Sequence, residues 1–158
     1  MKTLGPLDAI ELMMPGSYWQ LLTSVNGYAN PTSTSLSTQA AAGRGFQLLE
    51  KCSKMSLPCR FKVRLLEDGY VCWLNVNEIM GKIVETGPFE PKLLSLEQIY
   101  YRLTSVLLWV EKASVQPNKY LWGGTNGPDF DCSGLIQAAF SSEGIWVPRD
   151  AYQQERFC

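Results

Sequence analysis

A strict alternation of apolar and charged positions marks the clearest strand of this sequence. Phe61, Val63 and Leu65 are apolar, whereas Lys62 and Arg64 between them are charged. Because successive side chains of a strand point to opposite faces, this period of two predicts a half-buried β-strand.

The residues that follow predict a hairpin. Glu67, Asp68 and Gly69 separate the strand from a second apolar run, Tyr70–Leu74. An Asp-Gly pair between two strand patterns favours a two-residue turn, because both residues can adopt a positive φ.

Short apolar runs and turn formers continue to alternate from residue 18 to residue 85. Residues 30–35 read Asn-Pro-Thr-Ser-Thr-Ser, and residues 43–45 read Gly-Arg-Gly before the apolar run 46–49. This spacing predicts a small barrel of hairpins.

A helical pattern begins after residues 86–91, whose two prolines and one glycine are typical of a linker. Ser95 and Gln98 fit a capping box. Apolar residues then recur every three or four positions, which predicts a helix that Pro117 bounds after Ala113 and that buries one face. The predicted buried positions are Leu96, Ile99, Tyr100, Leu103, Leu107 and Val110.

A second helix is predicted over residues 131–143, with Gly144 placed to terminate it. Ile136, Ala139 and Phe140 would share its buried face. Cys132 would then lie in the first turn of this helix.

Composition excludes several classes of partner. The chain has 158 residues, and its 14 basic and 15 acidic side chains leave a net charge of -1 without any block of like charge. We therefore expect neither a nucleic acid nor a membrane surface as partner. Two prolines and two acidic residues interrupt the first 19 residues, so no signal peptide is expected, and no apolar run approaches the roughly 20 residues of a membrane span.

The cysteines are odd in number and irregularly spaced, which favours free thiols in a reducing compartment, here the cytoplasm. A zinc site at Cys52 and Cys59 would need two more ligands, and the chain contains no histidine. We expect no metal and no cofactor. The five cysteines are Cys52, Cys59, Cys72, Cys132 and Cys158.

Cys132 is the candidate nucleophile. At a helix N-terminus, unpaired backbone N–H groups and the positive end of the helix dipole favour thiolate over thiol. A lone helical cysteine is more often a small packing residue, so the choice depends on the residues around it.

Those residues form three motifs. Residues 120–124 read Tyr-Leu-Trp-Gly-Gly, residues 131–135 read Asp-Cys-Ser-Gly-Leu, and residues 148–154 read Pro-Arg-Asp-Ala-Tyr-Gln-Gln. In order and spacing they resemble the NlpC-type cysteine peptidase family. Residues 18–85 resemble the bacterial SH3-type domain that precedes the catalytic domain in cyanobacterial γ-D-glutamyl-L-diamino-acid endopeptidases.

The resemblance implies an α+β fold, in which a small SH3-like β-barrel precedes the helical first half of a papain-like cysteine peptidase domain. It divides the chain into four parts. These are an N-terminal extension (1–17), the SH3-like domain (18–85), a linker (86–94) and an incomplete NlpC-type peptidase domain (95–158).

The resemblance also implies an activity and a partner. Members hydrolyse the bond between D-glutamate and diaminopimelate in cell-wall peptides, so the expected partner is a small murein peptide such as L-Ala-γ-D-Glu-DAP, free or recycled. Cys132 would attack the amide carbonyl and form an acyl-enzyme, and N–H groups at the helix start would stabilise the oxyanion. Gly123 and Gly124 would let the backbone pass close to the site.

Five further positions match residues that line the family's substrate cleft. Asp131 would meet the free α-amino group of the substrate, although aspartate is also a good N-cap. Tyr70 matches a tyrosine that the first domain contributes, with packing as the alternative. Tyr120 and Ser133 match pocket positions, and Arg149 would either bind a substrate carboxylate or hold its loop through an ion pair.

The chain departs from the family in one respect that bears on activity. The family uses a histidine as general base, placed downstream of the residues that match 148–154, and this chain has none. By itself the chain is predicted to be inactive. Either a longer chain or a partner chain supplies the missing catalytic segment, or the protein is a truncated, catalytically dead homologue. A third alternative is a binding module in which Cys132 is inert.

Overall fold

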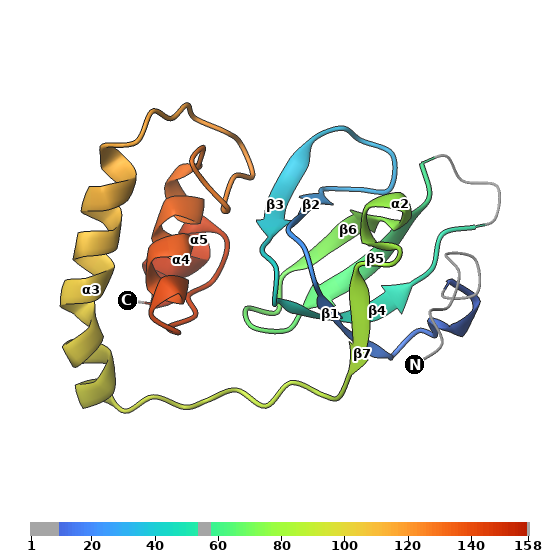
Figure 1. Cartoon of the computed structure of the whole chain (residues 1–158), viewed down its shortest axis with the longest axis horizontal. Helices are drawn as coiled ribbons and strands as arrows, with labels where there is room; N and C mark the ends of the chain where they lie inside the picture. The colour runs from blue at the N-terminus through green and yellow to red at the C-terminus, as the bar shows by residue number, and fades with distance from the viewer. Residues whose placement is uncertain (1–9, 54–57, 158) are drawn as a thin grey trace. The chain divides into compact units, whose positions relative to one another are not determined.

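The computed structural model describes residues 10–53 and 58–157. The chain divides into two compact units, Met1–Phe89 and Glu90–Cys158. The first unit contains all seven named strands, and the second contains three helices (Figure 1). The fold is therefore α+β.

The first unit is built on one antiparallel sheet. Its strand order is β3-β2-β6-β5-β4-β1-β7, so β3 and β7 are the edges. A short helix, α2 (Val76–Ile79), follows β6. The strands are β1 (Tyr18–Leu21), β2 (Val25–Tyr28), β3 (Leu36–Ala40), β4 (Gly45–Glu50), β5 (Arg60–Leu65), β6 (Val71–Asn75) and β7 (Ile83–Thr86).

The alternation on β5 is confirmed. Phe61, Val63 and Leu65 are fully buried in the core of the sheet, while Arg64 is exposed. Burial of such side chains contributes roughly 1.5–3 kcal/mol each relative to exposure. The apolar stripe of β5 therefore anchors the core of this unit.

The hairpin between β5 and β6 exists, but the predicted two-residue turn is wrong. The Leu65 N–H donates to the Tyr70 carbonyl at 2.8 Å, which leaves four residues in the loop. Gly69 has a φ of 71°, and the described part of the chain has no non-glycine residue with a positive φ. Asp68 therefore does not share the left-handed conformation that a two-residue turn of this type requires.

Arg44 explains the longer loop. Its guanidinium pairs with Glu67 at 3.0 Å and with Asp68 at 2.8 Å, and all three side chains are largely buried. Glu67 also accepts the Gly45 N–H at 2.7 Å. The two ion pairs and the hydrogen bonds to Glu67 hold both acidic residues inward and stabilise a wider turn than the local sequence favours.

The expectation of free thiols is wrong for two of the cysteines. Cys52 and Cys59 form a disulfide with a Cα–Cα distance of 5.5 Å. β4 and β5 pair as neighbours up to Glu50 and Lys62, which brings the residues beyond their ends together. The thiol count is therefore no longer a ground for a reducing compartment.

Removing the disulfide should destabilise the first unit measurably. A cross-link that closes so short a loop stabilises by about 2–3 kcal/mol through the entropy of the unfolded chain. We expect the double substitution Cys52→Ser/Cys59→Ser to lower the urea midpoint measured by tryptophan fluorescence, to which Trp19 and Trp73 of the first unit contribute. Reduced wild-type protein should behave like the double variant, and equal midpoints for oxidised and reduced wild type would contradict the expectation.

The second unit consists of α3 (Leu96–Ser114), α4 (Cys132–Ser142) and α5 (Ala151–Phe157). The capping box of α3 is confirmed, because Ser95 Oγ accepts the Gln98 N–H and Gln98 Oε1 accepts the Ser95 N–H. The predicted helix α4 is also confirmed, with Asp131 as N-cap and Glu143 as C-cap.

The predicted buried faces of the helices need correction. On α3 only Val106 is buried, while Leu96, Tyr100 and Leu107 are 78%, 74% and 64% exposed. On α4, Ala139 is buried but Ile136 is 41% exposed. Polar residues take the buried face of α4 instead: Ser133 is buried, and Gln137 is buried and donates to the Val147 carbonyl at 3.0 Å.

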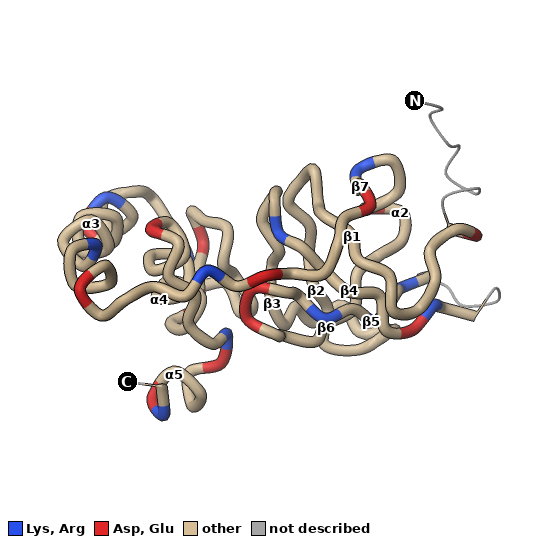
Figure 2. The backbone as a smooth tube through the Cα atoms, turned by 90° about the horizontal axis from the view of Figure 1, so that it is seen from below, with Lys and Arg blue, Asp and Glu red and all other residues tan. Residues whose placement is uncertain are grey.

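The charges are mixed along the chain, as the composition predicts. Figure 2 shows basic and acidic residues interspersed along the described chain of both units. Among the described residues no helix has the length and apolar character that crossing a membrane requires.

Candidate active site

Cys132 is the first residue of α4, and its side chain is exposed. The helix begins here because Asp131 has an extended backbone and its carboxylate accepts the Gly134 N–H at 2.7 Å, as an N-cap does. Beside Cys132 lies a hollow of about 280 Å³ within the second unit. Its lining residues are Ala113, Ser114, Asn118, Lys119, Tyr120, Phe130, Asp131, Cys132 and Leu135.

The segment before α4 folds back onto the helix start. The Leu121 N–H donates to the Phe130 carbonyl at 3.1 Å, and the Asp131 N–H donates to the Gly124 carbonyl at 3.2 Å. Gly123, with a φ of 82°, donates its N–H to Asp131 Oδ2 at 2.8 Å. The Tyr-Leu-Trp-Gly-Gly motif thus places its backbone against the helix that carries Cys132.

Two glycines allow this close approach. A Cβ on Gly134 would overlap the carbonyl oxygen of Gly124, and a Cβ on Gly124 would lie 2.5 Å from the carbonyl oxygen of Asp129. Both obstacles are backbone atoms, which do not rotate away as a side chain does.

Gly134→Ala should therefore separate the loop from the helix. We expect a loss of about 1–3 kcal/mol in the free energy of unfolding, as for overpacked sites, measured by urea denaturation with circular dichroism at 222 nm. Gly87→Ala is the control, because a Cβ there meets nothing within 4 Å. Equal midpoints for the two variants would show that the close approach is not required.

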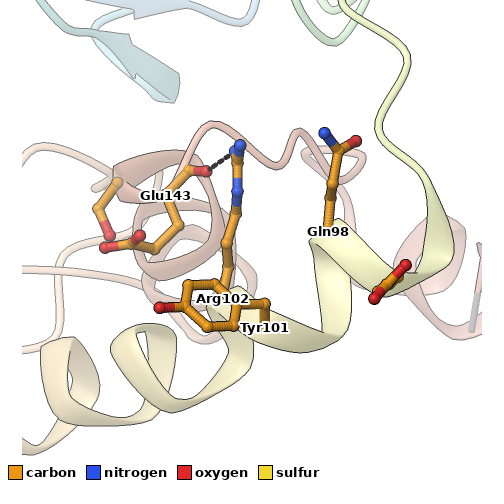
Figure 3. Close-up of a pocket in the computed structure, with 6 residues that line it drawn as sticks. Gln98, Tyr101, Arg102 and Glu143 are labelled. Carbon is orange, nitrogen blue, oxygen red and sulfur yellow. Dashed lines mark hydrogen bonds between the residues drawn. The ribbon is translucent and has the colours of Figure 1, made fainter.

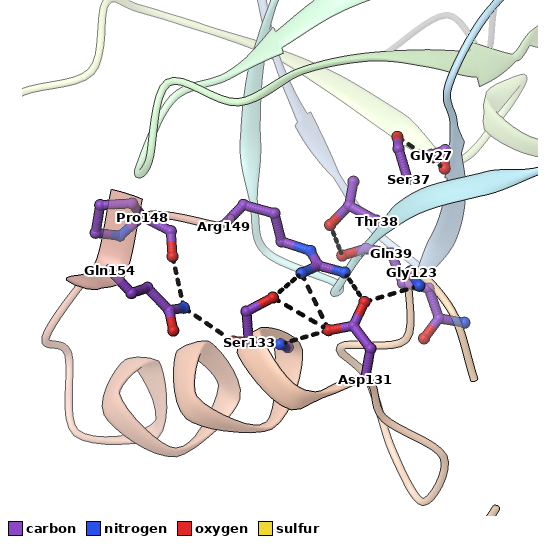
Figure 4. A network of polar contacts seen from close by, with 11 residues as sticks. Gly27, Ser37, Thr38, Gln39, Gly123, Asp131, Ser133, Pro148, Arg149 and Gln154 are labelled. Carbon is purple, nitrogen blue, oxygen red and sulfur yellow. Dashed lines mark hydrogen bonds and ion pairs between the residues drawn. The ribbon is translucent and has the colours of Figure 1, made fainter. Parts of the chain in front are cut away.

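The carboxylate of Asp131 accepts five hydrogen bonds (Figure 4). Oδ1 accepts from Gly134 N, from Arg149 Nη1 at 3.1 Å and from Ser133 Oγ at 3.3 Å. Oδ2 accepts from Gly123 N and from Arg149 Nη2 at 2.6 Å. An ionised carboxylate offers about four lone-pair sites. A substrate ammonium group would therefore have to displace an existing donor to reach Asp131.

These bonds fix the ionisation of Asp131. Burial alone would raise the pKa of its carboxyl group, but the hydrogen bonds from Arg149, Gly134 and Gly123 and the positive charge of Arg149 outweigh burial. The pKa of Asp131 consequently lies below its ordinary value. The group is a carboxylate at any pH near neutrality.

Arg149 and Ser133 complete the cluster. Arg149 is only 3% exposed, and besides Asp131 it donates to Ser133 Oγ at 2.9 Å. Arg149 forms an ion pair with Asp131, and its binding of a substrate carboxylate stays a prediction. Ser133 is buried, and its hydroxyl donates to Asp131 while it accepts from Arg149.

The two tyrosines lie in different units. Tyr120 is 66% exposed and lines the hollow together with Cys132. Tyr70 belongs to the first unit, where it is partly buried against the sheet core. The structure thus brings Cys132, Tyr120 and the Asp131 cluster together in one unit, while a role for Tyr70 in the same cleft stays a prediction.

Gln154 is a residue of this cluster that the sequence did not single out. Its Nε2 donates to the carbonyl oxygens of Ser133 at 3.0 Å and Pro148 at 2.8 Å. The only signal in the sequence is its place at the end of the third motif. Among the described residues no group of three potential metal ligands is present.

A second, larger hollow lies in the same unit between α3 and the C-terminal end of α4 (Figure 3). Arg102 crosses it and donates to the Glu143 carbonyl at 2.6 Å. The hollow has a volume of about 690 Å³ and neither Cys132 nor Asp131 lines it. The larger hollow therefore lies apart from the candidate nucleophile.

Two protein families match this chain, one within each of its two units. Residues 27–79 match the bacterial dipeptidyl-peptidase SH3 domain, and residues 117–157 match the NlpC/P60 family. Sequence similar to a bacterial SH3-type domain thus precedes sequence similar to the NlpC/P60 family, and Cys132 and the Asp131 cluster lie within the second match.

Similar curated proteins come from Bacillus. Two γ-D-glutamyl-L-lysine dipeptidyl-peptidases, from Bacillus cereus and Bacillus subtilis, are each 49% identical over 37 residues, which is 23% of this chain and 11% and 12% of theirs. The bifunctional muramidase/DL-endopeptidase CwlT of Bacillus subtilis is 44% identical over 45 residues, or 28% of this chain and 14% of that protein. The matched segments thus span about an eighth of these relatives.

Two solved structures are also similar. NlpC2 from Trichomonas vaginalis is 19% identical, with a TM-score of 0.32, 89% of this chain covered and 46% of that one. An NlpC/P60 family protein from Bacillus cereus is 20% identical, with a TM-score of 0.31, 94% of this chain covered and 43% of that one.

Proposed function

We propose that the second unit carries the nucleophile of a cysteine peptidase that acts on cell-wall peptides. The observation that supports this most directly is the exposed Cys132 at the start of α4, beside a hollow, within the segment that matches the NlpC/P60 model. The other free cysteine among the described residues, Cys72, is buried, and burial raises its pKa to about 12. Cys72 is therefore unsuited to nucleophilic attack.

The reaction would proceed through an acyl-enzyme. Cys132 Sγ adds to the carbonyl carbon of the scissile amide, the C–N bond breaks, and water then hydrolyses the thioester. N–H groups of the first helical turn lack intrahelical partners and point toward the developing oxyanion. Because Asp131 occupies the Gly134 N–H, the N–H groups of Cys132 and Ser133 are the donors proposed for this task.

The general base would come from outside these 158 residues, which contain no histidine. The thiol proton must be accepted and the leaving amine protonated, and such proton transfer is commonly worth about a hundred- to ten-thousandfold in rate. We propose that a further segment or a partner chain supplies this group, and that the 158 residues alone hydrolyse peptides slowly or not at all.

The names of the similar proteins support a substrate class. Two of them act at γ-D-glutamyl-L-lysine and one is a DL-endopeptidase. We therefore propose murein peptides with a γ-D-glutamyl bond, either L-Ala-γ-D-Glu-DAP or its lysine analogue.

The test combines sequence and chemistry. The message would be read beyond Cys158, and the protein that it encodes would be incubated with both peptides while released products are identified by mass. Cleavage that disappears in Cys132→Ser supports the proposal. A protein of about 17.7 kDa that copurifies with no partner and cleaves neither peptide would overturn it.

A binding module is the second candidate, because the chain lacks a histidine. In that case the chain would retain murein peptides without cleaving them, and Cys132→Ala would bind as well as the wild type. Equilibrium dialysis with the two peptides distinguishes this outcome from catalysis.

A further inference from the structure

Gln154 joins two stretches of backbone, the first turn of α4 and the residues just before α5. Its Nε2 spans the carbonyl oxygens of Ser133 and Pro148, and both N–H groups of the amide are used in doing so (Figure 4). Ser133 belongs to the first turn of α4, and Pro148 immediately precedes Arg149. Gln154 therefore holds the segment that carries Arg149 against the helix turn that carries Cys132.

Arg149 is the second tie between the same two elements. Its guanidinium bonds to both oxygens of Asp131 and to the hydroxyl of Ser133. Asp131 directly precedes Cys132, and a carboxylate without its cation disfavours a neighbouring thiolate. The closeness of Arg149 to Asp131 thus sets part of the electrostatic field at the Cys132 sulfur.

The other charged and titratable groups around Cys132 are few. Lys119 and Tyr120 line the same hollow, whereas α3 contributes only Ala113 and Ser114, which do not titrate. The Lys119 N–H donates to Asp129 Oδ1 at 2.8 Å, so Asp129 belongs to the same loop. These contacts do not involve Gln154, and a substitution there leaves them in place.

We propose that Gln154 is a positioning residue for Cys132. By holding the Arg149 segment on the first turn of α4, it keeps the charge of Asp131 compensated beside the thiol of Cys132. The inference rests on the proposed function, in which Cys132 is the nucleophile. It assigns to the last residue of the third motif a role that does not require contact with substrate.

The test follows alkylation of Cys132 by iodoacetamide as a function of pH. The full 158-residue chain would carry Cys158→Ser and be kept without reductant, so that the disulfide stays closed and Cys132 is the accessible thiol among those described. Gln154→Met keeps the length of the side chain but removes both N–H groups. Gln153→Met is the matched control, because Gln153 is an exposed neighbour on α5.

For Gln154→Met we expect alkylation at pH 7 to slow by about three- to tenfold and the midpoint of the pH profile to rise by about half to one unit. The control should match the wild type in both. If Gln154 served stability alone, the melting temperature would fall and the midpoint would stay unchanged, which would overturn the proposal. Gln154→Asn, which keeps the amide but cannot span both carbonyls, replaces the methionine variant should that variant lose its helical circular dichroism.

A double substitution tests the route through Arg149. In an Arg149→Lys background, Gln154→Met should change the alkylation rate by less than about twofold, because both residues act through the same contact. Full additivity would overturn the proposal. Alkylation of Cys132 needs no general base, so the two proposals can fail separately. If Gln154→Met shifts the midpoint of the alkylation pH profile but the protein cleaves no peptide, only the proposed function is contradicted. If the midpoint is unshifted in a protein that cleaves peptides, only the role of Gln154 is contradicted.

Discussion

Arg149→Met is expected to unfold most of the second unit at neutral pH. The substitution leaves the buried Asp131 carboxylate without its cation, and breaking a buried pair in this way costs about 3–5 kcal/mol. Whole domains are stable by only about 5–15 kcal/mol. Because α3, α4 and α5 lie in this unit, the loss should appear as a fall in circular dichroism at 222 nm.

Arg156→Met is the matched control. Arg156 is an exposed residue of α5, so this substitution removes the same charge at a solvent-facing position. It should retain the helical signal and the urea midpoint of the wild type. An Arg149→Met protein with an unchanged midpoint would mean that the buried pair contributes nothing to folding.

The same pair makes a prediction about acid. The pKa of Asp131 is lower in the folded protein than its unfolded value near 4, so the pair stabilises the fold above about pH 4. This contribution is lost as the pH falls below 4 toward the lower folded value, where the carboxylate takes up a proton. Asp131→Asn should therefore show a flatter acid limb in its urea midpoints than the wild type.

Cys132→Ser is expected to abolish both thiol labelling and peptide cleavage. Iodoacetamide should add one group to the wild-type chain that carries Cys158→Ser and none to the same chain with Cys132→Ser, because the sulfur of Cys72 is buried and that of Cys52 and Cys59 is oxidised. The cleavage assay uses the chain together with the segment or partner that supplies the base. There, serine at position 132 should slow hydrolysis at least a thousandfold, since its hydroxyl is a far weaker nucleophile than a thiolate.

Intact mass spectrometry under non-reducing conditions measures the labelling, and product release from the γ-D-glutamyl peptides measures the cleavage. Cys72→Ser is a poor control because its sulfur is part of the sheet core. Ser142→Ala on the exposed end of α4 is suitable. Retained cleavage in Cys132→Ser would remove this residue from the reaction.

Local signals predicted α3 and α4 well, whereas α2 and α5 were not predicted. Ser95 with Gln98, and Asp131 with Gly144, mark helix ends through bonds that the neighbouring sequence itself supplies. The same holds for the alternation on β5. These features depend on period and capping chemistry, which a single stretch of sequence contains.

What the sequence left open depends on distant partners. Periodicity on α3 identified apolar residues such as Tyr100 and Leu107 but not which of them another segment covers. The disulfide follows from the register of β4 and β5, which no spacing of two cysteines reveals. Arg149 could be assigned to the ion pair only once its guanidinium was placed beside Asp131.

The surroundings of Cys132 are drawn from a short continuous stretch of chain. Every bond of the Asp131 cluster joins residues between Gly123 and Gln154, so the contacts have small sequence separation. Segments rich in such local contacts close their loops at low entropic cost and fold quickly. During synthesis the surroundings of Cys132 can therefore form as soon as Gln154 has left the ribosome, and under the proposed function this would precede the arrival of the base.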